Sequence, residues 1–352
     1  DDRQKELFFC RIKKFNYLCA KEKKMVDFDT KIYCVAGHRF RVIADKACES
    51  WKRVAWHYDL FREESNDILF EVNIANTNAV TEDKEIKSLY DGMTLFFDDK
   101  PSEIGMTMLR VFCNSGDKML FEIQYPQSTQ TDAWMIAEKD FSSYRLLLRH
   151  SNEDNKLAQW VEDSTLTTSM MLCFMLSATK HNTLTMHSSC VVHEGKAYLF
   201  LGKSGTGKST HSRLWLKNIP DTILLNDDHP IIRIGEDGKA IAYGSPWSGK
   251  TDCYKNEKAE IGGIVKIERA PYNEIRQLST LEAYTKLIVS ASGMTWFEDM
   301  ASARHKTIEK LIGTVPCYEL KCLPDDEAAL VCNKKIAKKH ANGRIDYKDN
   351  PE

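Results

Sequence analysis

The sequence has no long hydrophobic run and no dominant charge. Its most apolar stretch, residues 170–178, is far shorter than the ~20 residues that cross a bilayer. Residues 1–24 are charged throughout and lack the apolar core of a secretory signal. The formal net charge of −2 over 352 residues creates no positive field that would attract nucleic acid. We therefore expect a cytoplasmic protein with neither a membrane nor a nucleic acid as its partner.

The cysteines lack the spacing of a metal site or a disulfide framework. There are 11 of them, without a CxxC pair and without the Cys/His spacing of a zinc site. An odd number of unpaired cysteines is typical of a reducing compartment. We expect them to be structural residues that are mostly buried.

The first part of the chain has the pattern of strands. Short alternating or apolar runs, separated by turn formers, predict a β-rich N-terminal domain over residues 1–150. No catalytic constellation is found there, and its role is left open. The predicted strands are 32–36, 40–43, 68–72, 93–97, 108–113, 119–124 and 144–148, with a hairpin turn at 114–117.

The second part alternates helices with strands. Leu157, Trp160, Leu166 and Met170 recur at helical spacing, which predicts a core helix over 155–180. An α/β domain is predicted over 151–335, followed by a polar tail over 336–352, so the whole chain is of the α/β or α+β class. The predicted strands are 189–192, 197–201, 222–225, 230–234, 261–267 and 317–322; the predicted helices begin at 209, 281, 300 and 328.

The strongest motif is GKSGTGKS at residues 202–209, a full match to GxxxxGK[ST]. In such a loop, glycines let backbone N–H groups turn toward phosphate oxygens, and the following helix adds its dipole. The alternative is a glycine-rich turn without a ligand, but an apolar run precedes the loop and a plausible helix follows it. We expect ATP to contact Gly202, Ser204, Gly205, Thr206, Gly207, Lys208, Ser209 and Thr210, with Lys208 on the β- and γ-phosphates and Ser209 on Mg²⁺.

An acidic pair, Asp227 and Asp228, follows the short predicted strand 222–225. Ligands of α/β sheets bind at the carboxyl ends of strands. Phosphoryl transfer uses one carboxylate on the metal and another near the attacking hydroxyl. The alternative is a turn or helix cap. The place of the pair beside a phosphate loop favours a catalytic role.

Two more residues are candidates. His187 precedes the strand 189–192, and a hairpin that turns at 193–196 would bring it near the loop. It is either a structural histidine or a proton shuttle or metal ligand. Lys250, in the segment PWSGK at 246–250, either lies over the nucleotide and neutralises transition-state charge or is a solvated turn residue.

The run MHSSCVVHEGKAYLFLGKSGTGKST, followed by LLNDDHPIIRI, resembles the P-loop superfamily of HPr serine kinase/phosphorylase and ATP-dependent phosphoenolpyruvate carboxykinase. Both families have a histidine at this distance before the loop and an Asp-Asp pair shortly after it. The resemblance implies a P-loop kinase domain with ATP and Mg²⁺, or Mn²⁺, bound. It also implies that Asp228 is a metal ligand, that Asp227 is the general base, and that His187 ligates metal or assists catalysis.

Three functions follow as hypotheses. The leading one is a kinase that transfers the γ-phosphoryl group of ATP–Mg to a hydroxyl, and the resemblance favours a protein or peptide acceptor over a small alcohol. The second is a carboxykinase-like lyase, although residues 161–169 lack the metal-ligating lysine of that family. The third is a nucleotide-sensing module that does no chemistry. A homo-oligomer is left open.

Overall fold

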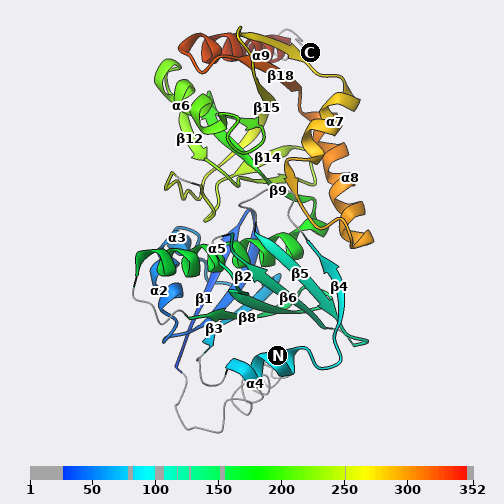
Figure 1. Ribbon diagram of the computed structural model, residues 1–352. Coiled ribbons are helices and arrows are strands. Elements are labelled where there is room, and N and C mark those ends of the chain that lie inside the picture. The colour runs from blue at the N-terminus through cyan, green and yellow to red at the C-terminus, as the bar shows by residue number, and fades with distance from the viewer. Residues whose placement is uncertain are drawn as a thin grey trace.

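The computed structural model describes residues 27–77, 82–99, 107–116, 118–126, 128–150, 155–249 and 251–346. Two mixed β-sheets, each accompanied by helices, lie one above the other in Figure 1. The fold is therefore mixed α/β, as expected in its coarse form. The division into domains at residue 150 stays a prediction.

The N-terminal sheet has eight strands in the order β1-β2-β3-β8-β7-β6-β5-β4. β5 and β6 are antiparallel neighbours, as the turn residues at 114–117 predict. β7 was not predicted, because its residues are buried on both faces and show no alternation. The strands are β1 (Phe28–Val35), β2 (His38–Asp45), β3 (Phe70–Thr77), β4 (Thr94–Asp98), β5 (Met108–Cys113), β6 (Lys118–Gln124), β7 (Ala133–Glu138) and β8 (Ser143–Arg149); the helices are α2 (Glu49–Val54), α3 (Trp56–Asp59) and α4 (Glu82–Leu89).

The long helix α5 (Lys156–Ala178) confirms the helix predicted over 155–180. The side chain of Asn155 caps it by accepting a hydrogen bond from the N–H of Ala158. The predicted core stripe is wrong at its start, where Leu157 and Trp160 are exposed. The reason is that the inner face of this end is polar: Glu162 is buried and pairs with Arg53 of α2.

The second sheet has ten strands, and its main path is β12-β10-β11-β15-β14-β13-β9-β17, with β18 beside β15 and β16 beside β18. The predicted strands and helices of this part are all found. The helix α9 continues to Asp346, past residue 336 where the polar tail was predicted to begin, and the tail itself stays a prediction. The elements are η1 (Thr179–His181), β9 (Thr183–Met186), β10 (Ser188–His193), β11 (Lys196–Leu201), α6 (Lys208–Asn218), β12 (Ile223–Asn226), β13 (Ile231–Ile234), β14 (Ala240–Tyr243), β15 (Lys258–Arg269), β16 (Glu274–Gln277), α7 (Thr280–Ile288), β17 (Ala291–Ser292), α8 (Glu298–Thr314), β18 (Cys317–Cys322) and α9 (Asp326–Asp346).

The position of β10 determines where the candidate residues lie. β10 is antiparallel to both β11 and β12. The carboxyl ends of β11 and β12 therefore share one edge of the sheet with the start of β10. The acidic pair follows β12, and β10 lies between β12 and β11, the strand that leads into the loop. The loop, the acidic pair and His187 nevertheless reach the same edge.

Side chains from the two halves of the chain meet at a buried junction. Trp247 is 2% exposed, donates its indole N–H to the Tyr58 hydroxyl at 3.2 Å, and contacts Phe174 at a ring distance of 5.0 Å. Arg233 also donates to the backbone oxygen of Ala36 at 2.8 Å. Most cysteines of the described residues are buried, as expected of structural cysteines. Over the same residues, no helix combines the length and apolarity that a membrane span needs, and the cytoplasmic location stays a prediction.

We expect Phe174→Ala to destabilise the protein, because Phe174 is fully buried between the N-terminal sheet and Trp247. Removal of such a side chain leaves a cavity that costs about 3–5 kcal/mol. Leu157→Ala is the control on the same helix, because Leu157 is 62% exposed, and it should change stability by less than about 0.5 kcal/mol. Denaturant unfolding measures both, and equal effects would contradict the packing described here.

Candidate functional site

The segment 202–209 forms a turn between β11 and α6. Gly205 and Gly207 have φ angles of +73° and +117°, a region that favours glycine. Gly207 is the N-cap of α6 and provides no side-chain hydrogen bond to the first turn. The helix therefore begins without a side-chain cap, and its first amides can bind an anion.

Lys208, the first residue of α6, is buried at the edge of the sheet, with only 7% of its surface exposed. Its ammonium donates to the Gly202 oxygen at 3.1 Å and to Nε2 of His187 at 3.0 Å. Burial lowers the pKa of Lys208, and the charges of Asp228 and Asp227 oppose that shift. The lysine is thus held as a buried cation between two acceptors.

His187 joins this lysine to the acidic pair. Burial, followed by the charge of Lys208, lowers the pKa of His187 to about 4, so the imidazole is neutral at neutral pH. Neutral Nε2 can accept the hydrogen bond from Lys208. The same Nε2 lies 3.5 Å from Oδ1 of Asp228. When the neutral imidazole accepts from Lys208, its Nε2 carries no proton. The contact between His187 and Asp228 is therefore a close approach and not an ion pair.

The two aspartates have different surroundings. Asp228 lies 3.1 Å from Nδ1 of His229. Burial raises the pKa of Asp228, but the hydrogen bond with His229 and nearby positive charges, including those of His229 and Lys208, outweigh burial and lower the pKa. Asp227 is 6% exposed, and its two oxygens accept hydrogen bonds from the hydroxyls of Ser189, at 2.7 Å, and Thr251, at 2.9 Å.

Buried Asn226 sets the direction of the acidic pair. Its side-chain oxygen accepts the backbone N–H groups of Asp228 at 2.9 Å and His229 at 2.8 Å. Its amide nitrogen donates to the Trp247 oxygen at 3.0 Å. An asparagine that bonds the backbone two residues on forms a tight turn, so the chain reverses directly after β12.

The structure thus brings Lys208, His187 and Asp228 together, and Asp227 is near enough to act on the charge of Lys208. Ser204, Ser209 and Thr210 lie on the loop and the first turn of α6. Lys250 lies outside the described residues. The sequence did not identify three residues that contact the aspartates. His229 could have been recognised, because it directly follows the acidic pair. Ser189 and Thr251 could not, because nothing in their local sequence indicates a contact with Asp227.

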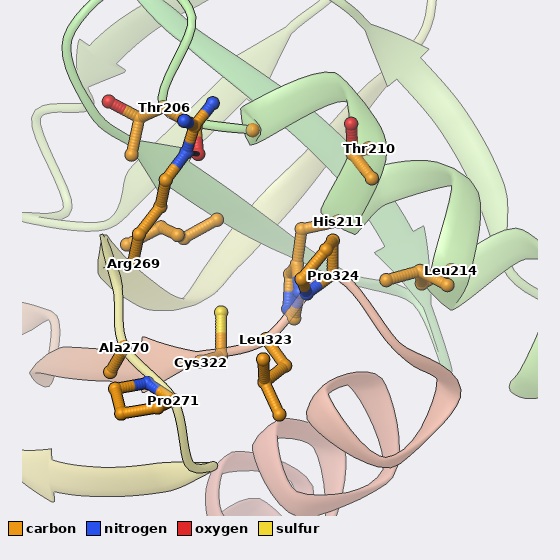
Figure 2. A pocket seen from close by; sticks show the side chains of 12 residues that line it. Thr206, Thr210, His211, Leu214, Arg269, Ala270, Pro271, Cys322, Leu323 and Pro324 are labelled. Carbon is orange, nitrogen blue, oxygen red and sulfur yellow. Dashed lines mark hydrogen bonds between the residues drawn. The ribbon is translucent and has the colours of Figure 1, made fainter.

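A cavity of about 480 Å³ opens beside the loop (Figure 2). It lies between the first turns of α6 and the ends of β15 and β18. Arg269, at the end of β15, donates to the backbone oxygens of Thr206, at 3.2 Å, and Gly205. The wall is mainly apolar and consists of Thr206, Gly207, Thr210, His211, Leu214, Ile267, Arg269, Ala270, Pro271, Cys322, Leu323 and Pro324.

The oxygen groups of the site match the preference of Mg²⁺. Among the described residues, no three His, Cys, Asp or Glu side chains are grouped as a metal cage. Mg²⁺ that accompanies a nucleotide needs only one or two protein oxygens, because phosphates and water complete its shell. The Ser209 hydroxyl and the Asp228 carboxylate are oxygen donors of this kind, and a magnesium site formed by them stays a prediction.

Comparisons with known proteins do not establish a family. No family model and no curated protein matches the chain. Among solved structures, the HPr(Ser) kinase/phosphatase from Coxiella burnetii is similar to 46% of this chain and 98% of its own, with a TM-score of 0.27 and 13% sequence identity. A likeness at this level carries no argument, so the family resemblance of the motifs stays a prediction.

The contact between Lys208 and His187 has a measurable consequence. In the folded protein His187 should titrate near pH 4 instead of at the ordinary 6.5, so the unfolded chain binds more protons between these values. This group's contribution to stability is therefore lost as the pH falls from 6.5 toward 4. Lys208→Met should raise the pKa of His187 part of the way, because burial remains.

NMR titration of the imidazole measures the pKa of His187. Lys217→Met is the matched control, because Lys217 lies at the far end of α6 and pairs with Asp326. An unchanged His187 pKa in Lys208→Met would show that the two groups do not interact in solution.

Proposed function

We propose that the protein is an ATP-dependent phosphotransferase that moves the γ-phosphoryl group to a hydroxyl. The observation that carries the proposal is the convergence of Lys208 and Asp228 on His187, at distances of 3.0 and 3.5 Å. A phosphate loop alone would support nucleotide binding. A carboxylate close enough to act on the charge of the same lysine would add a place for the metal and so supports transfer.

Lys208 and α6 would hold the triphosphate. When the triphosphate binds, its oxygens can replace His187 and Gly202 as the hydrogen-bond acceptors of the Lys208 ammonium, which stays in place. Ser209 and Asp228 would hold Mg²⁺, or Mn²⁺ in its place. The lowered pKa of Asp228 favours this role. A carboxylate that stays ionised is better suited to bind a metal than to act as a general base. The ion, when bound, neutralises charge on the transferred group.

Asp227 is the proposed general base. The hydroxyls of Ser189 and Thr251 both donate to it, so the carboxylate already accepts hydrogen bonds from alcohol groups. If the hydroxyl of the phosphoryl acceptor takes the place of the Thr251 hydroxyl, it can donate a hydrogen bond to the same oxygen of Asp227. The acceptor oxygen then forms a bond to the γ-phosphorus, the bond from that phosphorus to the bridging oxygen of ADP breaks, and the proton moves to Asp227. A protein or peptide acceptor is proposed from the motif resemblance.

Lys208→Ala should weaken ATP binding. Loss of a charge-assisted hydrogen bond costs about 1.5–3 kcal/mol, which corresponds to about 10- to 100-fold in the dissociation constant. Lys217→Ala, on the solvent side of the same helix, is the control and should bind ATP like the unaltered protein. Calorimetry measures both. Equal affinities in the two variants would remove Lys208 from the phosphate site.

Asp227→Asn should spare ATP binding and reduce transfer by about 10²- to 10⁴-fold, the usual contribution of a general base. Asp237→Asn, in the exposed turn between β13 and β14, is the matched control. The assay follows γ-labelled ATP into the proteins and small molecules of a cell lysate. Full transfer by Asp227→Asn would refute the base assignment, and ATP binding without transfer by the unaltered protein would favour the nucleotide-sensing alternative.

A further inference from the structure

Residues shortly after Trp247 lie directly against the acidic pair. The hydroxyl of Thr251 donates to Oδ2 of Asp227 at 2.9 Å. A Cβ added at Gly249 would lie 3.1 Å from the Cβ of Asp228, so the backbone here touches the second aspartate as well. Two residues of one short stretch therefore contact both carboxylates that the proposed function assigns to the transfer.

Hydrogen bonds on both sides of Thr251 hold it in this place. Its own backbone oxygen accepts the hydroxyl of Ser248 at 2.6 Å. Before it in the chain, the backbone oxygen of Trp247 accepts the amide of Asn226 at 3.0 Å. After it, the thiol of Cys253 donates to a backbone oxygen of β12 at 3.5 Å. The stretch is thus fastened at both sides to β12, the strand that precedes the acidic pair.

Thr251 is better placed to react than the second hydroxyl on the same carboxylate. Ser189 also donates to Asp227, at 2.7 Å, but it is fully buried on β10. Because its one proton is used there, its oxygen accepts from the hydroxyl of Ser212 of α6 at 2.5 Å, and a phosphoryl group would displace that helix. Thr251 is only partly buried and lies outside strands and helices. A hydroxyl that donates its proton keeps two lone pairs, with which the Thr251 oxygen can attack phosphorus.

We propose that Thr251 is a phosphoryl acceptor, so that each molecule phosphorylates itself at this residue. The inference rests on the proposed function, because ATP at residues 202–209 supplies the group. When no other acceptor takes its place, the Thr251 oxygen forms a bond to the γ-phosphorus. The bond from that phosphorus to the bridging oxygen of ADP breaks, and the hydroxyl proton moves to Asp227. No encounter in solution is needed, because the fold already holds the hydroxyl on the base.

The first test incubates the purified full chain with γ-labelled ATP and Mg²⁺ and locates the phosphoryl group by mass spectrometry of peptides. It should lie on Thr251. Thr251→Val keeps the shape of the side chain and should lose this modification, and Thr251→Ser, which restores a hydroxyl, should regain it. Thr285→Val is the matched control, because the Thr285 hydroxyl donates to the backbone of its own helix, α7, and this variant should be modified like the unaltered protein. Modification of other residues while Thr251 stays free would overturn the proposal.

A second test determines whether the transfer stays within one molecule. Asp227→Asn should reduce phosphorylation of Thr251 by about 10²- to 10⁴-fold. Addition of unaltered protein should not restore it, because each Thr251 is held on the Asp227 of its own chain. In the unaltered protein, the modified fraction should grow at the same rate at every protein concentration. Phosphorylation of Asp227→Asn by the unaltered protein, or a rate that rises with concentration, would overturn transfer within the molecule.

The outcomes separate this inference from the proposed function. Transfer from ATP to acceptors in a lysate, by a protein whose Thr251 stays unmodified with and without the lysate, would refute self-phosphorylation and leave the proposed function standing. If neither Thr251 nor any lysate acceptor receives the phosphoryl group, the proposed function fails and the inference with it.

Discussion

The candidate site depends on the direction of one strand. β10 runs antiparallel to its two neighbours, β11 and β12, so a strand start and two strand ends coincide at one edge of the sheet. Lys208 can be buried there as a cation because a backbone oxygen and a neutral imidazole accept hydrogen bonds from it and two carboxylates lie nearby. Reversing β10 would carry His187 to the opposite edge and leave the lysine without that partner.

The N-terminal sheet is physically connected to this edge. Tyr58 of α3 accepts the indole N–H of Trp247, and the backbone oxygen of Trp247 accepts the amide of Asn226. Asn226 in turn fixes the backbone of Asp228 and His229. Tyr58, Trp247 and Asn226 are buried, so displacement of one of them leaves an unpaired polar group in the next. The β-rich half therefore supports the direction of the acidic pair, apart from any role of its own.

Local patterns predicted the glycine turn before α6, most of the strands and the residues that gather around Lys208, because glycine spacing and apolar runs reflect backbone geometry directly. They failed where the outcome depends on distant neighbours. Polar–apolar alternation did not indicate β7, because this strand is buried on both faces. Helical spacing wrongly placed Trp160 in the core, because Glu162 and Arg53 occupy the inner side of the start of α5. No sequence pattern singled out His211, because its contacts with Trp215 and with the cavity depend on the fold.

The central claim is that the loop and the acidic pair act on one triphosphate. A crystal structure with a non-hydrolysable ATP analogue and Mn²⁺, located by its anomalous scattering, tests it most directly. The account predicts the triphosphate against residues 202–209 with Lys208 on its terminal phosphates, and Mn²⁺ bound by Ser209 and Asp228. A triphosphate bound elsewhere, or a metal that contacts neither of these oxygens, would contradict it.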